Sequence, residues 1–269
     1  MSIVETTGGL RQYLEHDLKA IEESYEHWAP EFQAFVRLSE IYQVLVATVV
    51  VVDEKHYIPG AHLLVVESQM YGVVSELLRR RPIDAQVLTR RAIEAAATAY
   101  RVWKYPELLP VFKDAYPNFL DQNHPGRWKP SARYRQEFST FKLFGEPGDT
   151  WKSMKTLYEV LSAKSSHTGP GATIPHVTKE GACHLSFREK DDIEIRRCWY
   201  AVLTAFWNCL KVFLAMMRDT GKPAMISVIE EDMKKWQAQI AKQIDERAYW
   251  MKDKNTSAAQ SDFIIIPSM

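Results

Sequence analysis

The sequence predicts an all-α protein, a multi-helix bundle with one small β-hairpin inserted before the penultimate long helix. Two observations lead to this fold class. Apolar residues recur at intervals of three and four along most of the chain, which is the period of an amphipathic helix. Only residues 174–187 combine two short apolar runs with a turn signal, Lys179-Glu180-Gly181, as a hairpin requires.

The composition is that of an ordinary globular protein. The chain has 269 residues, of which 46% are hydrophobic, and shows no internal repeat. We expect a single helical domain over residues 1–254, followed by a flexible tail over residues 255–269. The tail begins with a polar linker and ends in the apolar run Phe263-Ile264-Ile265-Ile266. This end is expected to dock on its own domain or on a partner.

Charge and cysteine content point to the cytoplasm and exclude a global attraction to nucleic acid or membrane. Lys plus Arg and Asp plus Glu both number 34, so any affinity for an anionic partner has to come from a local patch. The three cysteines have no CxxC spacing, which fits a reducing compartment. The N-terminus lacks the pattern of a signal peptide, and the apolar segment 41–52 is too short for a membrane span. We therefore expect no membrane association.

The clearest helical pattern covers residues 83–105, which we take as the central helix. Its apolar positions fall on one side: Leu88, Ala92, Ala96, Ala99, Tyr100 and Trp103. Arg90, Glu94 and Arg101 fall on the other side. This charged stripe is either a solvated face or one wall of a functional site, for which residues 162–167 would supply the second wall.

The other helices follow from the same spacing and from turn residues. We expect helices over 10–28, 31–52, 61–80, 106–120, 149–165, 193–218 and 225–250. The β-branched end of the second of these, residues 47–52, is also compatible with a buried strand. Pro59-Gly60 is expected to break the chain before the third helix, and Asp149 or Thr150 is expected to cap the fifth.

Two basic stretches are candidate nucleic-acid-binding surfaces. Arg79 and Arg80 lie at the end of the helix predicted over 61–80, where a helix dipole also favours cations. The connection 121–138 interleaves aromatic residues with Arg127, Trp128, Arg133 and Arg135, a composition suited to stacking on bases and neutralising phosphates. The alternative is an exposed loop anchored by its tryptophan.

Short motifs in the chain resemble a known family. The sequence LTRRAIEAA contains Arg90 and Glu94, and the helix ending LYEVLSAKSSHTGPG contains Tyr158, Leu161, Ser162 and His167. Together with the small hairpin that follows, they resemble the bacterial all-helical family called domain of unknown function 5677, over about residues 59–217. That family is similar in helical layout to the HEPN superfamily, which includes ribonucleases of toxin and phage-defence systems.

The resemblance implies a HEPN-like fold and a protein that binds or cleaves RNA. HEPN ribonucleases carry an Arg and a His on one helix with four to six residues between them, and this chain departs from that pattern. The corresponding positions before His167 hold Leu161, Ser162 and Ala163, and the spacing occurs instead at Arg11 and His16, outside the resembling region.

The candidate catalytic residues are Arg90, Glu94 and His167. In RNA cleavage the His would act as general acid or base, the Arg would hold the scissile phosphate, and the Glu would orient the imidazole. The alternative is a buried polar network that locks the hairpin loop to the central helix. The second function considered is a non-catalytic interaction module that assembles with a protein partner or with itself through helical faces or the tail.

No motif points to a cofactor or a metal. Gly145-Glu146-Pro147-Gly148 lacks both the Lys-Ser/Thr ending and the preceding strand of a phosphate-binding loop. Zinc ligands could be sought among the His and Cys residues after position 166, but no pair has the short metal-binding spacing. We therefore expect no bound metal and no cofactor.

Overall fold

The computed structural model of the chain describes residues 9–48, 54–117, 129–165, 192–218 and 223–247. All regular structure in these ranges is helical, which confirms the all-α class. The long helices are α1 (Gly9–His27), α2 (Ala29–Thr48), α3 (Glu54–Leu78), α4 (Pro82–Lys104), α8 (Asp149–Ser165), α10 (Asp192–Met217) and α11 (Pro223–Arg247). The hairpin predicted within residues 174–187 and the tail at 255–269 lie outside the described residues, as does His167.

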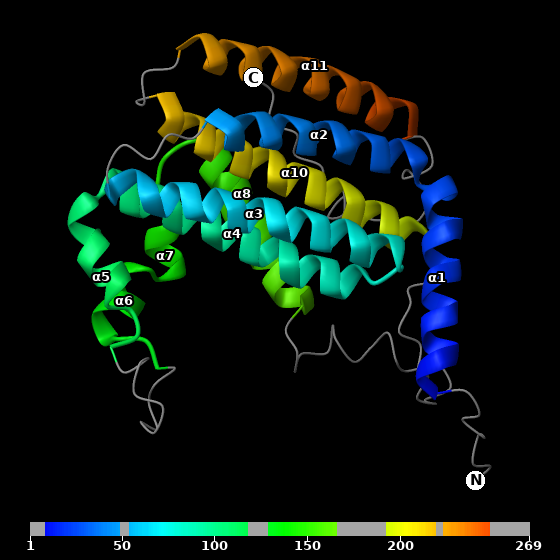
Figure 1. Cartoon of the computed structure of the whole chain (residues 1–269), viewed down its shortest axis with the longest axis horizontal. Coiled ribbons are helices and arrows are strands. Elements are labelled where there is room, and N and C mark those ends of the chain that lie inside the picture. Colours follow the sequence, from blue (N-terminus) through cyan, green and yellow to red (C-terminus); the bar gives the residue numbers. More distant parts are fainter. Residues whose placement is uncertain (1–8, 49–53, 118–128, 166–191, 219–222, 248–269) are drawn as a thin grey trace, which may run out of the picture.

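The bundle is organised around α4 and α10 (Figure 1). Helix α4 contacts α3, α10 and α8, and its longest interface is with α3. The sequence explains this close approach, because α4 presents mainly alanines to its neighbours. On the facing helix, a Cβ added at Gly72 would lie 3.0 Å from Leu88 Cδ1. Small residues on both helices therefore let α3 and α4 pack tightly.

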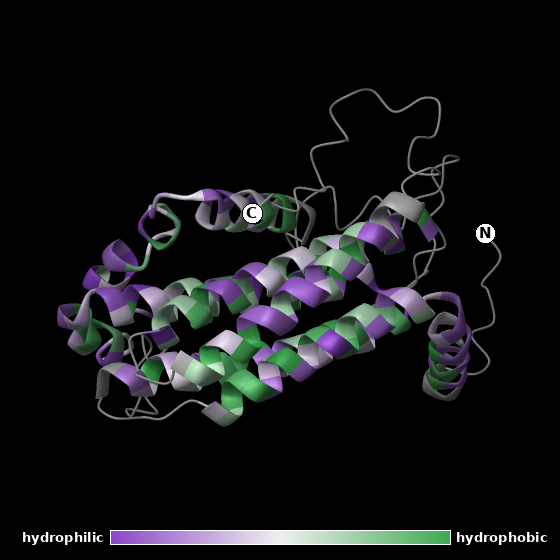
Figure 2. Ribbon diagram, turned by 90° about the horizontal axis from the view of Figure 1, so that it is seen from above, coloured by the Kyte–Doolittle hydropathy of each residue, from purple (hydrophilic) through white to green (hydrophobic). Residues whose placement is uncertain are grey.

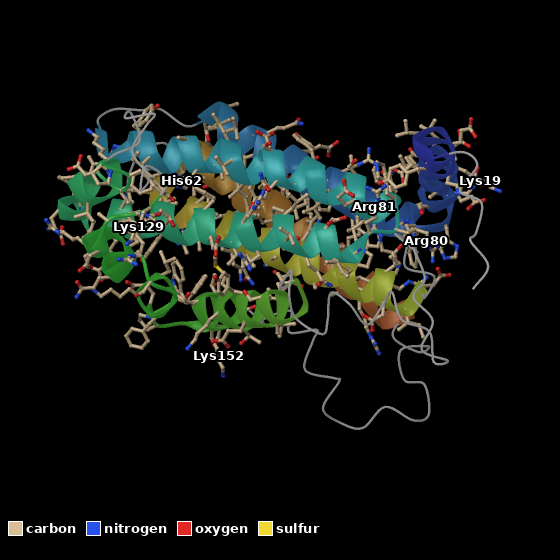
Figure 3. The ribbon with its side chains drawn as sticks, turned by 90° about the horizontal axis from the view of Figure 1, so that it is seen from below. Lys19, His62, Arg80, Arg81, Lys129 and Lys152 are labelled. Carbon is tan, nitrogen blue, oxygen red and sulfur yellow. The ribbon has the colours of Figure 1, made fainter. Side chains whose placement is uncertain are left out.

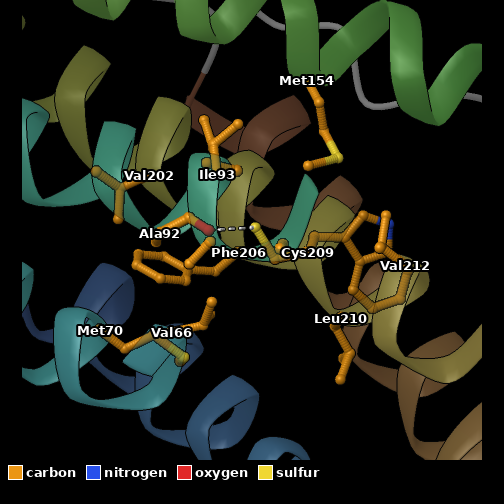
Figure 4. Close-up of a cluster of buried hydrophobic side chains, with 14 of the residues drawn as sticks. Val66, Met70, Ala92, Ile93, Met154, Val202, Phe206, Cys209, Leu210 and Val212 are labelled. Atoms are coloured by element: carbon orange, nitrogen blue, oxygen red, sulfur yellow. Dashed lines mark hydrogen bonds between the residues drawn. The ribbon is translucent and has the colours of Figure 1, made fainter. Parts of the chain in front are cut away.

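Helix α10 is the most deeply buried long helix of the described fold. Figure 4 shows its Val202, Phe206 and Cys209 among apolar side chains of α3, α4 and α8. The Cys209 thiol donates a weak hydrogen bond of 3.9 Å to the Ala92 carbonyl, and burial raises the pKa of this thiol. By length and composition α10 could cross a membrane, but 72% of its most apolar window is buried inside the bundle. Its hydrophobicity is accounted for by core packing.

Helices α2 and α11 cover one side of α10, as the blue and orange ribbons of Figure 1 show. The Trp236 indole fixes this layer, since its Nε1 donates a 2.7 Å hydrogen bond to the Ala34 carbonyl. Its ring also stacks on Trp207 of α10, with ring centroids 4.9 Å apart. In contrast, α1 stands at one end of the bundle and crosses the other helices steeply (Figures 1 and 2).

The break predicted at Pro59-Gly60 is wrong, because α3 runs through Pro59 without interruption. A proline here removes one early hydrogen bond and crowds the preceding turn. Packing holds the helix together, since Ile58 and Leu63 on either side are buried in the core. The His62 ring also contributes a 2.9 Å contact from Nδ1 to the Ile58 carbonyl. Tertiary burial therefore outweighs the local breaker.

The helix predicted over residues 106–120 is shorter than expected. It divides into the 3₁₀ turn η1 (Pro106–Leu108) and α5 (Leu109–Lys113). The connection predicted over residues 121–138 contains a short helix, α6 (Ala132–Glu137), and α7 (Thr140–Leu143) follows it. Ser131 caps α6 by accepting a hydrogen bond from the Tyr134 backbone N–H, a capping signal hidden in a Pro- and Arg-rich stretch.

Candidate functional site

The predicted site residues on α4 meet α8 at a polar group that we call the α4–α8 cluster: Arg90, Glu94, Tyr158 and Ser162. The Tyr158 hydroxyl donates a 2.7 Å hydrogen bond to Glu94 Oε1. Arg90 Nε lies 3.8 Å from the same oxygen, and the guanidinium carbon lies 5.9 Å from the Tyr158 ring centroid. Tyr158 therefore contacts both charged side chains that α4 contributes to this cluster.

This cluster is partly open to solvent. The side chains of Arg90 and Glu94 are 34% and 36% exposed, so this pair is neither fully solvated nor fully buried. Two of its atoms, Arg90 Nε and Ser162 Oγ, are buried and have no hydrogen-bond partner among the residues that the structure describes. Both atoms are buried, whereas the Arg90 side chain as a whole is 34% exposed, so a partner from solvent would meet the outer part of the guanidinium first.

The pKa of the Tyr158 hydroxyl is raised above its ordinary value. Burial is the largest cause, and the hydrogen bond to the Glu94 carboxylate adds to it because a second negative charge beside Glu94 is unfavourable. A weaker opposing effect comes from Thr140 and from the nearby Arg90 charge. Tyr158 thus stays a neutral donor to Glu94 throughout the physiological pH range.

Helices α4 and α8 run antiparallel, which orients the end of α8. Tyr100 contacts Trp151 at 4.8 Å between ring centroids, whereas Tyr158 contacts Glu94 one to two turns earlier on α4. The described part of α8 ends at Ser165, beside the N-terminal half of α4. His167 follows two residues later, outside the described residues, so its contact with Glu94 stays a prediction.

Arg101 shares the charged stripe of α4 in sequence, but it belongs to a different group of contacts. Its Nε donates a 2.6 Å hydrogen bond to the Glu137 carbonyl, and its Nη2 lies 3.0 Å from the Glu137 carboxylate. Lys142 pairs with the same carboxylate at 2.8 Å and, with Arg101, holds the pKa of Glu137 below its ordinary value. Arg101 therefore anchors α6 and α7 to α4.

The predicted nucleic-acid-binding residues lie at opposite ends of the bundle. Figure 3 shows Arg80 at the end where α1 crosses and Lys129, which precedes α6, at the other. Arg133 and Arg135 on α6 are exposed, and neither has an ion pair within 4 Å among the described residues. Arg127 and Trp128 lie outside the described residues. The structure does not join the two stretches into one surface.

At the other end, the arginines contact carboxylates from distant parts of the chain. We call this group the Asp17 corner: Asp17, Glu76, Arg79, Arg80, Arg81 and Asp192. Asp17 Oδ1 lies 2.7 Å from Arg81 Nη2, and Asp17 Oδ2 lies 3.2 Å from Arg79 Nε. Arg80 Nη2 lies 2.6 Å from Asp192 Oδ1. These pairs tie α3 to α1 and α10.

The backbone of the Asp17 corner explains how α3 ends. Arg80 has a φ of 61°, a left-handed conformation that usually selects glycine. Its N–H donates to the Leu77 carbonyl at 2.9 Å, and the Arg81 N–H donates to the Glu76 carbonyl at 2.8 Å. This is a Schellman end, with an arginine held in the strained position. The ion pair with Asp192 helps to offset that strain.

The sequence reasoning missed a second group of polar residues, which lines a cavity of about 490 Å³ between the start of α8, α10 and α11. Its central cation is Lys211 of α10. A signal was present, because Lys211 is the only charged residue between positions 198 and 217 of a strongly apolar helix. Among the described residues, no group of three or more His, Cys, Asp or Glu side chains is arranged to hold a metal ion.

Comparisons with known proteins add no family: no family model matches the sequence, and no curated protein and no solved structure matches the chain.

Proposed function

We propose that this protein acts on RNA at the α4–α8 cluster, as a HEPN-like ribonuclease. The observation that supports this best is the state of Arg90. Its side chain is 34% exposed, its guanidinium is held over Tyr158, and its Nε has no hydrogen-bond acceptor among the described residues. A phosphate oxygen is the acceptor that such a fork of donors matches.

Each residue of the proposed site has a distinct role. Arg90 would hold the scissile phosphate and stabilise the charge that develops on it. His167 would transfer the proton at the attacking or leaving oxygen, as general base or acid. Glu94, fixed by Tyr158, would orient the imidazole and favour its protonated form. The described part of α8 ends at Ser165, beside the N-terminal half of α4. His167 follows two residues later in the sequence.

The neighbouring α6 offers a path for the RNA backbone. The Glu94 charge contributes to the raised pKa of Tyr134, after burial and Tyr116, so α6 borders the cluster. Arg133 and Arg135 flank Tyr134 on this helix and are exposed. Exposed arginines suit single-stranded RNA because they neutralise its phosphates, while Tyr134 itself is packed on Phe138 at 4.7 Å between ring centroids.

The test is incubation of the purified full chain with end-labelled mixed RNA, with variants R90A, E94Q and H167A. We expect cleavage to fall at least about a hundredfold in R90A and H167A, in line with the loss of a general acid–base or an electrostatic group. Arg91→Ala is the matched control, since Arg91 is the exposed neighbour on the same helix. Absence of cleavage by the wild type, or full activity of R90A, would overturn the proposal.

A non-catalytic interaction module is the second candidate function, and the outer face of α3 favours it. Four large apolar side chains on this helix are between 44% and 60% exposed: Tyr57, Leu64, Val65 and Tyr71. Patches of this kind mark protein interfaces. If the chain self-associates there, light scattering should show an oligomer that Leu64→Glu converts to a monomer. A wild-type monomer at high concentration would reject self-association through α3.

A further inference from the structure

The cavity between α8, α10 and α11 has a lining of unusual charge. We call it the Lys211 pocket, and its lining includes the cations Lys211, Arg218 and Lys234 and the single carboxylate Glu230. Arg218 and Glu230 pair with each other. Neither Lys211 nor Lys234 has a carboxylate within 4 Å among the described residues. Within the described part of the chain, the nearest acidic influences on these two cations, Asp149 on Lys211 and Glu231 on Lys234, act from beyond ion-pairing distance.

Lys211 is the less solvated of the two. It projects from the buried helix α10, and its Nζ lies 5.7 Å from the centroid of the Trp207 ring. Burial lowers the pKa of Lys211, and the Asp149 carboxylate at the start of α8 offsets this only in part. An ammonium group in such a place is stabilised strongly by an anion that approaches it.

Two further features of the lining suit an anion with an apolar body. Trp207 is 3% exposed, and its buried Nε1–H has no hydrogen-bond acceptor in the part of the chain that the structure describes. Thr150, which follows Asp149 at the start of α8, adds a side-chain hydroxyl that can donate a hydrogen bond to an oxyanion. Leu214, Ala215 and Met233 add apolar surface to the lining, and Gln237 adds a polar amide. A volume of about 490 Å³ lies within the range of small-molecule sites.

We propose that the Lys211 pocket binds a small organic anion, with a phosphate or carboxylate group held by Lys211 and Lys234 and an apolar or aromatic body against Leu214 and Met233. The site is separate from the α4–α8 cluster and does not depend on the RNA proposal. A protein that fails to cleave RNA would still bind such an anion, and a protein that binds no small anion could still act on RNA.

The test is isothermal titration calorimetry at constant ionic strength with phenyl phosphate and benzoate as probes. Inorganic phosphate and benzyl alcohol serve as comparisons, because each carries only half of the proposed ligand. We expect the aromatic anions to bind at one site per chain. The tighter binder of the two, phenyl phosphate or benzoate, shows whether the site prefers a phosphate or a carboxylate. Both comparison compounds should bind at least about tenfold more weakly, since each lacks one set of contacts.

The deciding variant is Lys211→Met, which keeps the length and removes the charge. Binding should weaken about tenfold or more in K211M, to a smaller extent in K234M, and not at all in the control Lys19→Met on α1. Lys211→Arg preserves the charge and shows whether a loss in K211M reflects the cation, and circular dichroism checks each fold. If no aromatic anion binds the wild type, or if K211M binds as tightly as wild type, the proposal is wrong.

Discussion

The Asp17 corner and the Lys211 pocket both contain partly buried cations, but only those of the corner pair with carboxylates of the described fold. At the corner, Asp17 has an exposed side-chain fraction of 10% and contacts two guanidiniums, and Asp192 contacts a third. In the pocket, Lys211 lies next to an aromatic ring, with its nearest acidic influence from Asp149 acting at a longer range. At the corner, carboxylates of the fold pair with the arginines. In the pocket, no carboxylate of the described residues lies within 4 Å of Lys211, and we propose that a ligand supplies the negative charge.

The presence or absence of a paired carboxylate distinguishes the structural role of the Asp17 corner from the binding role that we propose for the Lys211 pocket. A buried ion pair with good geometry fixes the arrangement of helices, and removal of one partner leaves an uncompensated charge. A half-buried cation without a carboxylate contributes little to the fold and is suited to a ligand. The α4–α8 cluster lies between these cases, since Arg90 pairs loosely with Glu94 and keeps a free donor.

The largest expected effect is at the corner. Asp17→Asn should lower the free energy of unfolding by about 2 kcal/mol, because it removes the carboxylate that joins Arg79 and Arg81 to α1 while Glu76 still pairs with both. Urea denaturation followed by circular dichroism measures the change.

Glu23→Gln is the matched control for this prediction. Glu23 pairs with Lys19 on the same helix, but both side chains are about two-thirds exposed or more. Its loss should cost less than about 0.5 kcal/mol. Equal effects of the two variants would remove the distinction between the corner and an ordinary surface pair.

The second prediction concerns the α4–α8 cluster, where the loss of stability should be smaller than at the Asp17 corner. Tyr158→Phe removes the hydroxyl that donates to Glu94, and we expect a loss of about 1 kcal/mol at neutral pH. Because the folded pKa of Tyr158 is raised, its contribution is complete below the unfolded value near 10 and is lost as pH rises through the folded pKa.

The wild type and the Tyr158→Phe variant should therefore converge in stability on the alkaline side. Thermal melts at pH 8 and above pH 10 would measure the difference between them. A difference that stays constant across this range would show that the hydrogen bond to Glu94 does not contribute as the geometry indicates.

The sequence was sufficient for the helices and insufficient for their charge partners. Helical spacing located the long helices because core positions follow the 3.6-residue period, and the central helix began and ended within a residue of its prediction. The pattern failed at Pro59, where burial of Ile58 and Leu63 holds a helix through a residue that locally favours a break.

Electrostatic roles could not be predicted, because they depend on residues far apart in the chain. Arg79, Arg80 and Arg81 form a basic run in sequence, and only the fold brings Asp17 and Asp192 to them. The same limit applies to the Lys211 pocket, whose walls come from three separate helices. Arg90 and Glu94 were predicted as neighbours because they are four residues apart on one helix, which places their side chains together.

The smallest expected change in the free energy of unfolding is at the Lys211 pocket, where a substitution should stabilise the fold slightly or leave it unchanged. Without a ligand, Lys211→Met should leave stability unchanged or raise it by about 0.5 kcal/mol, the scale of a substitution away from structural pairs. The folded pKa of Lys211 is lowered, so its charged form is disfavoured by folding at neutral pH. This cost is present below the folded pKa and disappears above the unfolded value near 10.5, so the gain from Lys211→Met should fade at high pH.

Urea titrations at pH 7 and pH 10.5 check both statements, with Lys19→Met as the exposed control. A clear loss of stability in Lys211→Met at pH 7 would assign Lys211 to the fold, as at the Asp17 corner, and end the contrast between the two regions.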